Sequence, residues 1–80
     1  MTTYVIVQWT PFPGEYQPIA EWQLQEAEFD LRLNKTHYYE HATRNGNDLT
    51  YSKKIAEQIV SYWLKRYSFA KYQIIKSECE

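Results

Sequence analysis

Cysteine and glycine are scarce in this 80-residue chain, which therefore has few residues for disulfide bonds or for flexible turns. It contains two glycines and one cysteine, Cys79, so no disulfide can form within it. A lone thiol is typical of a reducing compartment, and we expect a cytoplasmic protein. Chains of this length bury about 60% of their unfolded surface. Without staples, a single α+β domain over residues 1–80 therefore depends on a rich core.

Long apolar runs are absent as well. No stretch approaches the ~20 residues that span a bilayer. The opening residues, MTTYVIVQW, include no Lys or Arg, so we expect neither a signal peptide nor a membrane partner. The serines stand in no catalytic motif, and neither glycine belongs to a phosphate-binding loop. We therefore expect no enzyme activity, no cofactor and no small-molecule substrate.

Basic side chains are missing from the first 30 residues. That segment holds five acidic residues and no Lys or Arg, a charge of −5. Residues 31–76 hold all nine bases and three acids, a charge of 9 − 3 = +6. Such a split indicates either a nucleic-acid face or two halves that neutralise each other, within one chain or between chains.

Aromatic residues, by contrast, are abundant: three Trp, eight Tyr and three Phe. Each ring removes about 150–250 Å² from water when it is buried, so a small core can be built from them. Eight tyrosines are more than such a core can hold, and tyrosine is enriched at protein interfaces. We expect some of these rings to face solvent or a partner.

The clearest helical pattern is at residues 52–67. Ser52 is a favourable N-cap, and apolar residues then recur at i, i+3 and i+4 spacing. The apolar arc is wider than one sheet face can cover. The helix therefore needs a second cover, which is the 10–18 loop, a short first helix or another chain. Residues 4–9 and 71–76 are rich in β-branched and aromatic residues, and they predict a central strand and a closing strand.

The segment between the first strand and the middle of the chain is ambiguous. Residues 27–33 alternate between apolar and polar side chains, which predicts a half-buried strand with Glu28 on its solvent face. Residues 18–27 fit either a strand or a short helix. On a helix, Gln23 and Glu26 would fall inside the apolar arc, so the strand is favoured.

Turn residues divide the remaining chain. All three prolines lie in residues 10–18, which predicts a loop, and Asn34-Lys35 predicts a turn into a third strand at 36–43. A break follows at 45–48. The sequence therefore predicts an α+β fold in which one long helix packs on an antiparallel-rich sheet of about four strands, in the order β-β-β-α-β. With a short first helix the order becomes the ferredoxin-like βαββαβ. The last strand can then lie parallel to a neighbour through a right-handed crossover.

One short motif suggests a metal site. Residues 37–41 read HYYEH, the H-x-x-E-H pattern of a class of zinc hydrolases. On a helix, His37 and His41 would lie on one face and could bind one ion. On the expected strand they stand about 13 Å apart and cannot share a metal. We therefore expect no metal site, and zinc hydrolysis is the third alternative for function.

The proline-rich segment and the strand before it carry the candidate binding residues Trp9, Phe12 and Tyr16. Rings held between prolines lose little conformational entropy on binding. We therefore predict a small protein-binding module, an accessory or inhibitory factor that occludes a partner's surface and can self-associate as a homodimer. Its acidic first half would steer it toward a basic partner.

The second alternative is nucleic-acid binding by a basic and aromatic C-terminal face. Phosphates attract cations, and unstacked bases stack on flat rings. The candidate residues are Lys53, Lys54, Lys65, Arg66, Lys71 and Lys76. The last helical turn suits its two cations, whereas the two lysines of the first turn oppose the helix dipole. That arrangement is a weak indication that cations are required there for binding.

Overall fold

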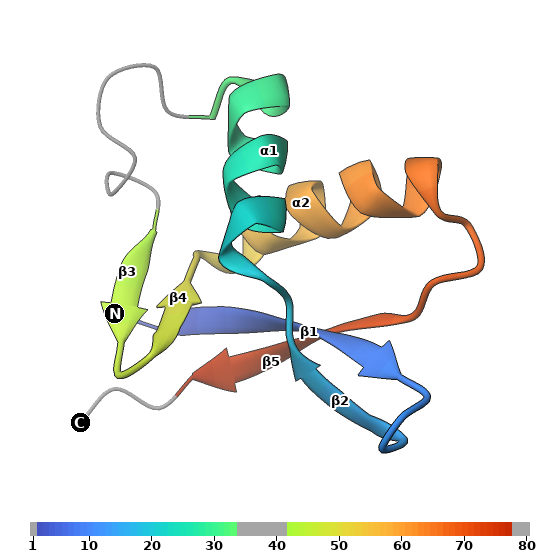
Figure 1. Cartoon of the computed structure of the whole chain (residues 1–80). Coiled ribbons are helices and arrows are strands. Elements are labelled where there is room, and N and C mark those ends of the chain that lie inside the picture. Colours follow the sequence, from blue (N-terminus) through green and yellow to red (C-terminus); the bar gives the residue numbers. More distant parts are fainter. Residues whose placement is uncertain (1, 34–41, 78–80) are drawn as a thin grey trace.

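The computed structural model describes residues 2–33 and 42–77. Its elements are β1 (Thr3–Thr10), β2 (Glu15–Pro18), α1 (Glu21–Leu31), β3 (Thr43–Asn45), β4 (Asp48–Thr50), α2 (Lys53–Arg66) and β5 (Tyr72–Ser77). The fold is α+β, as predicted. Within the described ranges, however, it has two helices instead of one long helix, and its strands form a three-stranded and a two-stranded sheet. Both helices lie on the same face of the larger sheet (Figure 1).

The larger sheet is antiparallel throughout, in the order β2-β1-β5. The prediction of a central first strand is confirmed, because β1 lies between the other two. The parallel crossover that the sequence allowed for the last strand is not formed, since β5 runs antiparallel to β1. The reason is visible in Figure 1: α2 runs in the same direction as β1, and the short turn after it reverses the chain.

The expected loop at 10–18 is shorter than predicted. Its second half forms β2, so β1 and β2 make a hairpin with a turn at residues 11–14. Gly14 has a φ of +89°, a value that glycine adopts without strain, and its N–H donates to the carbonyl of Thr10 at 2.9 Å. Pro18 is tolerated in β2 because this short strand lies at the sheet edge.

The strands expected at 18–27 and 27–33 are wrong, because this segment forms α1. The residues that α1 buries are Leu24, Ala27 and Glu28, at i, i+3 and i+4 spacing. Glu28 therefore points into the protein and not toward solvent as the strand would require. The apolar/polar alternation downstream was misleading, since Phe29 is 81% exposed on the helix surface.

The second hairpin matches the break predicted at 45–48. β3 and β4 pair across Gly46, whose φ is +65°, and Asn47. The strand β4 was not predicted. Directly after it, Tyr51 forms an isolated antiparallel bridge with Tyr4 of β1, which connects this hairpin to the larger sheet. Together with the extra strand β2, this antiparallel contact separates the fold from the ferredoxin-like alternative. Most of the strand expected at 36–43 lies outside the described residues.

The prediction of a helix over 52–67 is confirmed by α2. The Ser52 hydroxyl accepts from the N–H of Ile55 at 3.4 Å and caps the helix. Ala56, Ile59 and Trp63 are buried against the sheet and against α1. The second cover that the wide apolar arc requires is therefore the short first helix. Neither α1 nor α2, the helices of the described residues, is long and apolar enough to cross a membrane.

Candidate protein-binding surface

The three residues predicted to bind a protein come from one hairpin. Trp9 of β1 pairs directly with Tyr16 of β2, and their ring centroids lie 5.2 Å apart in an edge-to-face arrangement. Trp9 is 39% exposed, so this pair is open to solvent on one side. Phe12 occupies the turn and is 93% exposed. The structure thus brings Trp9 and Tyr16 together and presents Phe12 beside them on the same hairpin.

A groove adjoins this hairpin. It has a volume of about 300 Å³ and is lined by Gln8, Trp9, Pro11, Phe69, Ala70 and Lys71. Phe69 lies between α2 and β5 and is 84% exposed. Sequence reasoning missed this residue, because it belongs to neither the helical nor the strand pattern around it. We call Trp9, Phe12, Tyr16 and Phe69 the hairpin surface.

The position of Phe69 is set by a chain of ring contacts that begins in the core. Trp63 is 1% exposed and stacks on Tyr67, with centroids 6.0 Å apart and planes 13° apart. Tyr67 in turn makes an edge contact with Phe69 at 6.2 Å. An exposed ring is thereby placed by a buried one, which lowers the entropy cost of using it in binding.

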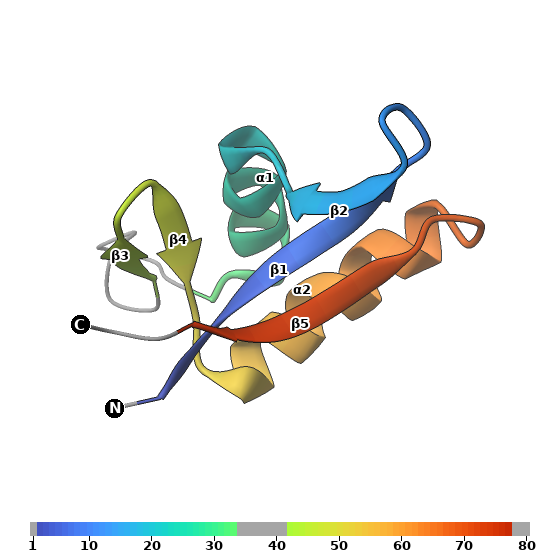
Figure 2. The ribbon, with the colours of Figure 1, turned by 90° about the horizontal axis from the view of Figure 1, so that it is seen from below.

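The outer face of the sheet continues the hairpin surface. Ile6 packs in the core under the helices, so alternation along β1 turns Val5, Val7 and Trp9 to the opposite face. Val7 is 5% exposed there, so this face is covered at the centre of β1. On that face Val5 pairs with Ile75, which is 43% exposed. Figure 2 shows this face from below, with both helices behind the sheet. No described helix covers it.

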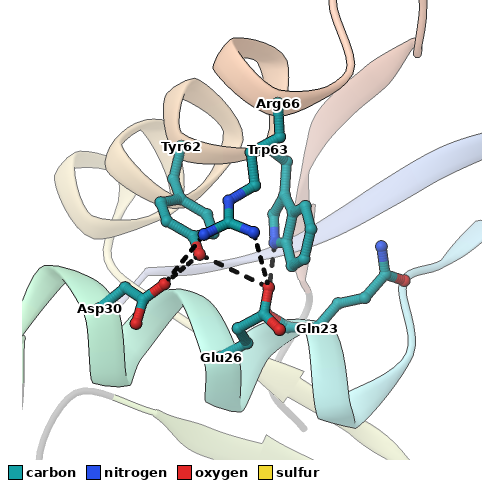
Figure 3. A network of polar contacts seen from close by, with 6 residues as sticks. All are labelled: Gln23, Glu26, Asp30, Tyr62, Trp63 and Arg66. Atoms are coloured by element: carbon teal, nitrogen blue, oxygen red, sulfur yellow. Dashed lines mark hydrogen bonds and ion pairs between the residues drawn. The ribbon is translucent and has the colours of Figure 1, made fainter.

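The inner face carries a polar network between α1 and α2 (Figure 3). Arg66 forms ion pairs with Glu26 at 3.7 Å and with Asp30 at 3.2 Å. The Tyr62 hydroxyl donates to Asp30 and, at 3.5 Å, to Glu26. The guanidinium of Arg66 also lies 4.9 Å from the centre of the Tyr62 ring. These contacts join one face of α1 to one face of α2.

Two further properties indicate that the network is structural and holds α1 against α2. Desolvation by burial and the hydrogen bond to Asp30 raise the pKa of Tyr62 to about 12. Its hydroxyl is therefore a neutral donor at physiological pH and a poor general acid. The indole N–H of Trp63 donates to the backbone carbonyl of Gln23 at 3.2 Å, which adds a bond between the same helices.

The network also explains the charge split of the sequence. Acidic residues of α1 pair with basic residues from the second half of the chain, as Glu21 does with Arg44 at 3.5 Å. Part of the split is therefore neutralised within one chain. It follows that Glu21, Glu26 and Asp30 are less available for steering a basic partner than we predicted.

The six predicted nucleic-acid-binding residues are not gathered in one place. Arg66 is engaged with two carboxylates. Lys54 and Lys65 lie near opposite ends of α2, and eleven residues of helix separate them by about 16 Å. Lys71 and Lys76 lie near opposite ends of β5. Lys53 adjoins Lys54 at the start of the helix.

A buried carboxylate is the second feature that sequence reasoning missed. Glu28 is 3% exposed, and the hydroxyl of the buried Tyr51 donates to its Oε2 at 3.0 Å. The two residues are 23 positions apart, so no local pattern signals the pair. The abundance of tyrosine is the only signal in the sequence that could have pointed to a buried hydroxyl donor.

The HYYEH motif lies outside the described residues. Among residues 2–33 and 42–77, no three His, Cys, Asp or Glu side chains are grouped so that they could hold a metal ion. No family model matches this chain, and comparison with curated proteins and with solved structures finds no match either.

Proposed function

We propose that this protein is a non-enzymatic binding module that docks on a partner protein through the hairpin surface. The supporting observation is that Trp9 and Phe69 line one groove at the end of the β1–β2 hairpin. Tyr16 contacts Trp9, and Phe12 is exposed in the turn of the same hairpin. Phe12 and Phe69 are 93% and 84% exposed. Most of the apolar area of both rings is therefore still in contact with water and can be buried in a partner's pocket. Aromatic anchors of this kind dominate the energetics of protein interfaces.

The mechanism is occlusion of the partner's surface. Trp9 and Tyr16 form a pair of contacting rings on the outer face of the sheet, and Phe12 is exposed in the turn of the same hairpin. A partner that presents an apolar pocket would receive Phe12, while the groove beside Trp9 and Phe69 would receive one of the partner's side chains. An accessory or inhibitory factor needs no more than such a fit.

The geometry favours a protein over a nucleic acid as the partner. Backbone phosphates require several cations along one track. Of the described residues that line its groove, Lys71 alone carries a positive charge. Apolar contact would therefore carry the affinity, and binding is expected to change little with salt.

The test is capture of a partner from native lysate by two matched variants. Phe12→Ala removes an exposed ring of the hairpin surface. Phe29→Ala removes the same type of side chain from the surface of α1, where Phe29 is 81% exposed. We expect Phe12→Ala to lose the captured protein and Phe29→Ala to retain it. Loss in both variants, or in neither, would refute the proposed surface.

A nuclease step separates this proposal from the nucleic-acid alternative. The captured protein should remain bound after nuclease treatment and between about 50 and 300 mM salt, where phosphate contacts weaken by orders of magnitude. Release by nuclease, or a steep loss of binding with salt, would instead support the lysine-based hypothesis.

A further inference from the structure

The strand β5 lies at the margin of the larger sheet. It pairs with β1 over six residues, from Thr3 opposite Ser77 to Gln8 opposite Tyr72. Within the described part of the chain no strand pairs with its other edge, and Figure 2 shows β5 with no strand beyond it. One edge of β5 therefore presents backbone groups that no described residue pairs.

The hydrogen-bond pattern shows which groups these are. The N–H of Trp9 donates to the carbonyl of Lys71 at 2.9 Å, so the backbone of Lys71 faces β1. In an antiparallel ladder this orientation alternates. Gln73, Ile75 and Ser77 must then face β1 as well. The residues between them, Tyr72, Ile74 and Lys76, turn their N–H and C=O groups away from the sheet.

The far side of β1 supports this assignment. Tyr4 exchanges two backbone hydrogen bonds with Tyr51, and the carbonyl of Ile6 accepts from Ile19. Both residues therefore face away from β5, as the same alternation requires of the residues opposite Lys76 and Ile74. Among the described residues, no hydrogen bond reaches the outward backbone groups of β5.

We propose that the occupant of this edge is a second copy of the chain, paired antiparallel through β5. With Ile74 opposite the partner's Ile74, Tyr72 lies opposite the partner's Lys76, and Lys76 lies opposite the partner's Tyr72. Each of these three residue pairs can exchange two hydrogen bonds. Six bonds then use all six outward groups of each strand. A shift by two residues in either direction leaves groups unpaired on both strands.

The side chains fit the same register. Residues directly opposite share a face in an antiparallel pair, so both copies place their helices on one side. Tyr72 then faces the partner's Lys76, which is a favourable arrangement of ring and cation. No two lysines stand opposite each other. A shift by one residue would set Lys71 against the partner's Lys76 and would also reverse the faces.

The edge lacks two of the devices that protect strands against such pairing, although it contains the charged residue Lys76. Exposed edge strands are commonly interrupted by proline or by a bulge. β5, YQIIKS, contains no proline, and its register with β1 runs without interruption. The dimer would contain one sheet of six strands with two hairpin surfaces on a common outer face. The proposal does not depend on the hairpin surface, because the two sets of residues do not overlap.

The test combines mass with amide hydrogen exchange. Sedimentation equilibrium from about 1 µM to about 1 mM should show the mass rise from 9.7 kDa toward twice that value. Across that range, amide exchange at Tyr72, Ile74 and Lys76 should slow at least tenfold. Exchange at Gln73 and Ile75 should be slow at every concentration. A monomer at all concentrations, or a dimer in which the three amides exchange freely, would overturn the proposal.

A matched pair of variants at Lys76 isolates the backbone. Lys76→Pro removes an outward N–H, which an edge strand tolerates in the folded monomer. Lys76→Ala removes the same side chain and keeps the N–H. We expect the proline variant to remain monomeric. The alanine variant should still dimerise, more weakly than the wild type because it lacks the contact of its cation with the partner's Tyr72. Both should keep the circular dichroism of the wild type. If the proline variant is unfolded, the amide exchange of Tyr72, Ile74 and Lys76 in the wild type is sufficient to accept or reject the proposed interface. Dimers of a folded Lys76→Pro, or loss of dimers in Phe12→Ala with Lys76→Pro unaffected, would place the interface elsewhere.

Discussion

The inner and outer faces of the three-stranded sheet use aromatic residues in opposite ways. On the inner face, Trp63 is buried and Tyr62 is bonded to carboxylates of α1. On the outer face, Trp9 and Tyr16 contact each other and remain open to solvent. The same residue types therefore hold the fold together on one side and are available to a partner on the other. Substitutions on the two faces should have separable effects on stability and on binding.

The largest expected difference is between Trp63 and Phe12. Trp63→Ala should lower the free energy of unfolding by about 3–5 kcal/mol, because it leaves a cavity in the core and removes the bond to Gln23. Phe12→Ala should change it by less than about 0.5 kcal/mol. Urea denaturation measures both values. A large loss of stability in Phe12→Ala would assign that ring to the fold.

The next effect concerns the buried carboxylate. Tyr51→Phe removes the hydroxyl that donates to Glu28. A buried acceptor that loses its donor costs about 1–3 kcal/mol, so this variant should be destabilised by that amount while it keeps its ring in the core. Thermal denaturation of Tyr51→Phe beside Tyr16→Phe, whose hydroxyl lies on the outer hairpin, provides the control. Equal midpoints for the two variants would contradict the assigned role.

Removal of the hydroxyl should have opposite effects on stability at Tyr62 and at Tyr72, and both effects should be smaller than that of Tyr51→Phe. Tyr62→Phe removes a donor to Asp30 and should lower the unfolding midpoint. The Tyr72 hydroxyl is buried and, within the described residues, has no hydrogen-bond partner. Tyr72→Phe should therefore leave the midpoint unchanged or raise it, because it removes an unsatisfied polar group. Denaturant titrations of both variants test this, and destabilisation by Tyr72→Phe would show that its hydroxyl is bonded in solution.

The smallest effect is a pH dependence on the inner face. The pKa of Tyr62 is raised from 10.0 to about 12, so the folded state holds this proton more tightly than the unfolded chain does. The resulting stability is fully present below pH 10 and is lost as the pH rises through 12. Burial also raises the pKa of Tyr72, so the comparison must be made against Tyr62→Phe. That variant should lose less stability between pH 9 and 11 than the wild type, and equal losses would remove Tyr62 from the account.

The two helices differ in how well the sequence predicts them. In α2 the apolar residues follow one period and Ser52 marks the start, so local pattern is sufficient. In α1 the residues that face α2 include Glu26, and the buried set includes Glu28. Their partners, Arg66 and Tyr51, are far away in the chain. A local pattern counts such residues as misplaced until the tertiary contacts are known.

The candidate site shows the same limit. Trp9, Phe12 and Tyr16 were found because prolines and aromatic residues are concentrated around them, and the hairpin then placed them together. Phe69 was missed because its position depends on Tyr67 and on the end of α2. The lysines were grouped by sequence alone, and the fold separates them. Composition therefore indicates which residues are available, whereas topology decides which of them meet.

The central claim is that the hairpin surface, and not the exposed ring of Phe29 on α1, contacts a partner. Photo-crosslinking tests it most directly, with benzoylphenylalanine in place of Phe12 in one protein and of Phe29 in another. The account predicts a covalent adduct with one protein species from position 12 in native lysate, and none from position 29. Adducts of equal yield from both positions, or from position 29 alone, would contradict it.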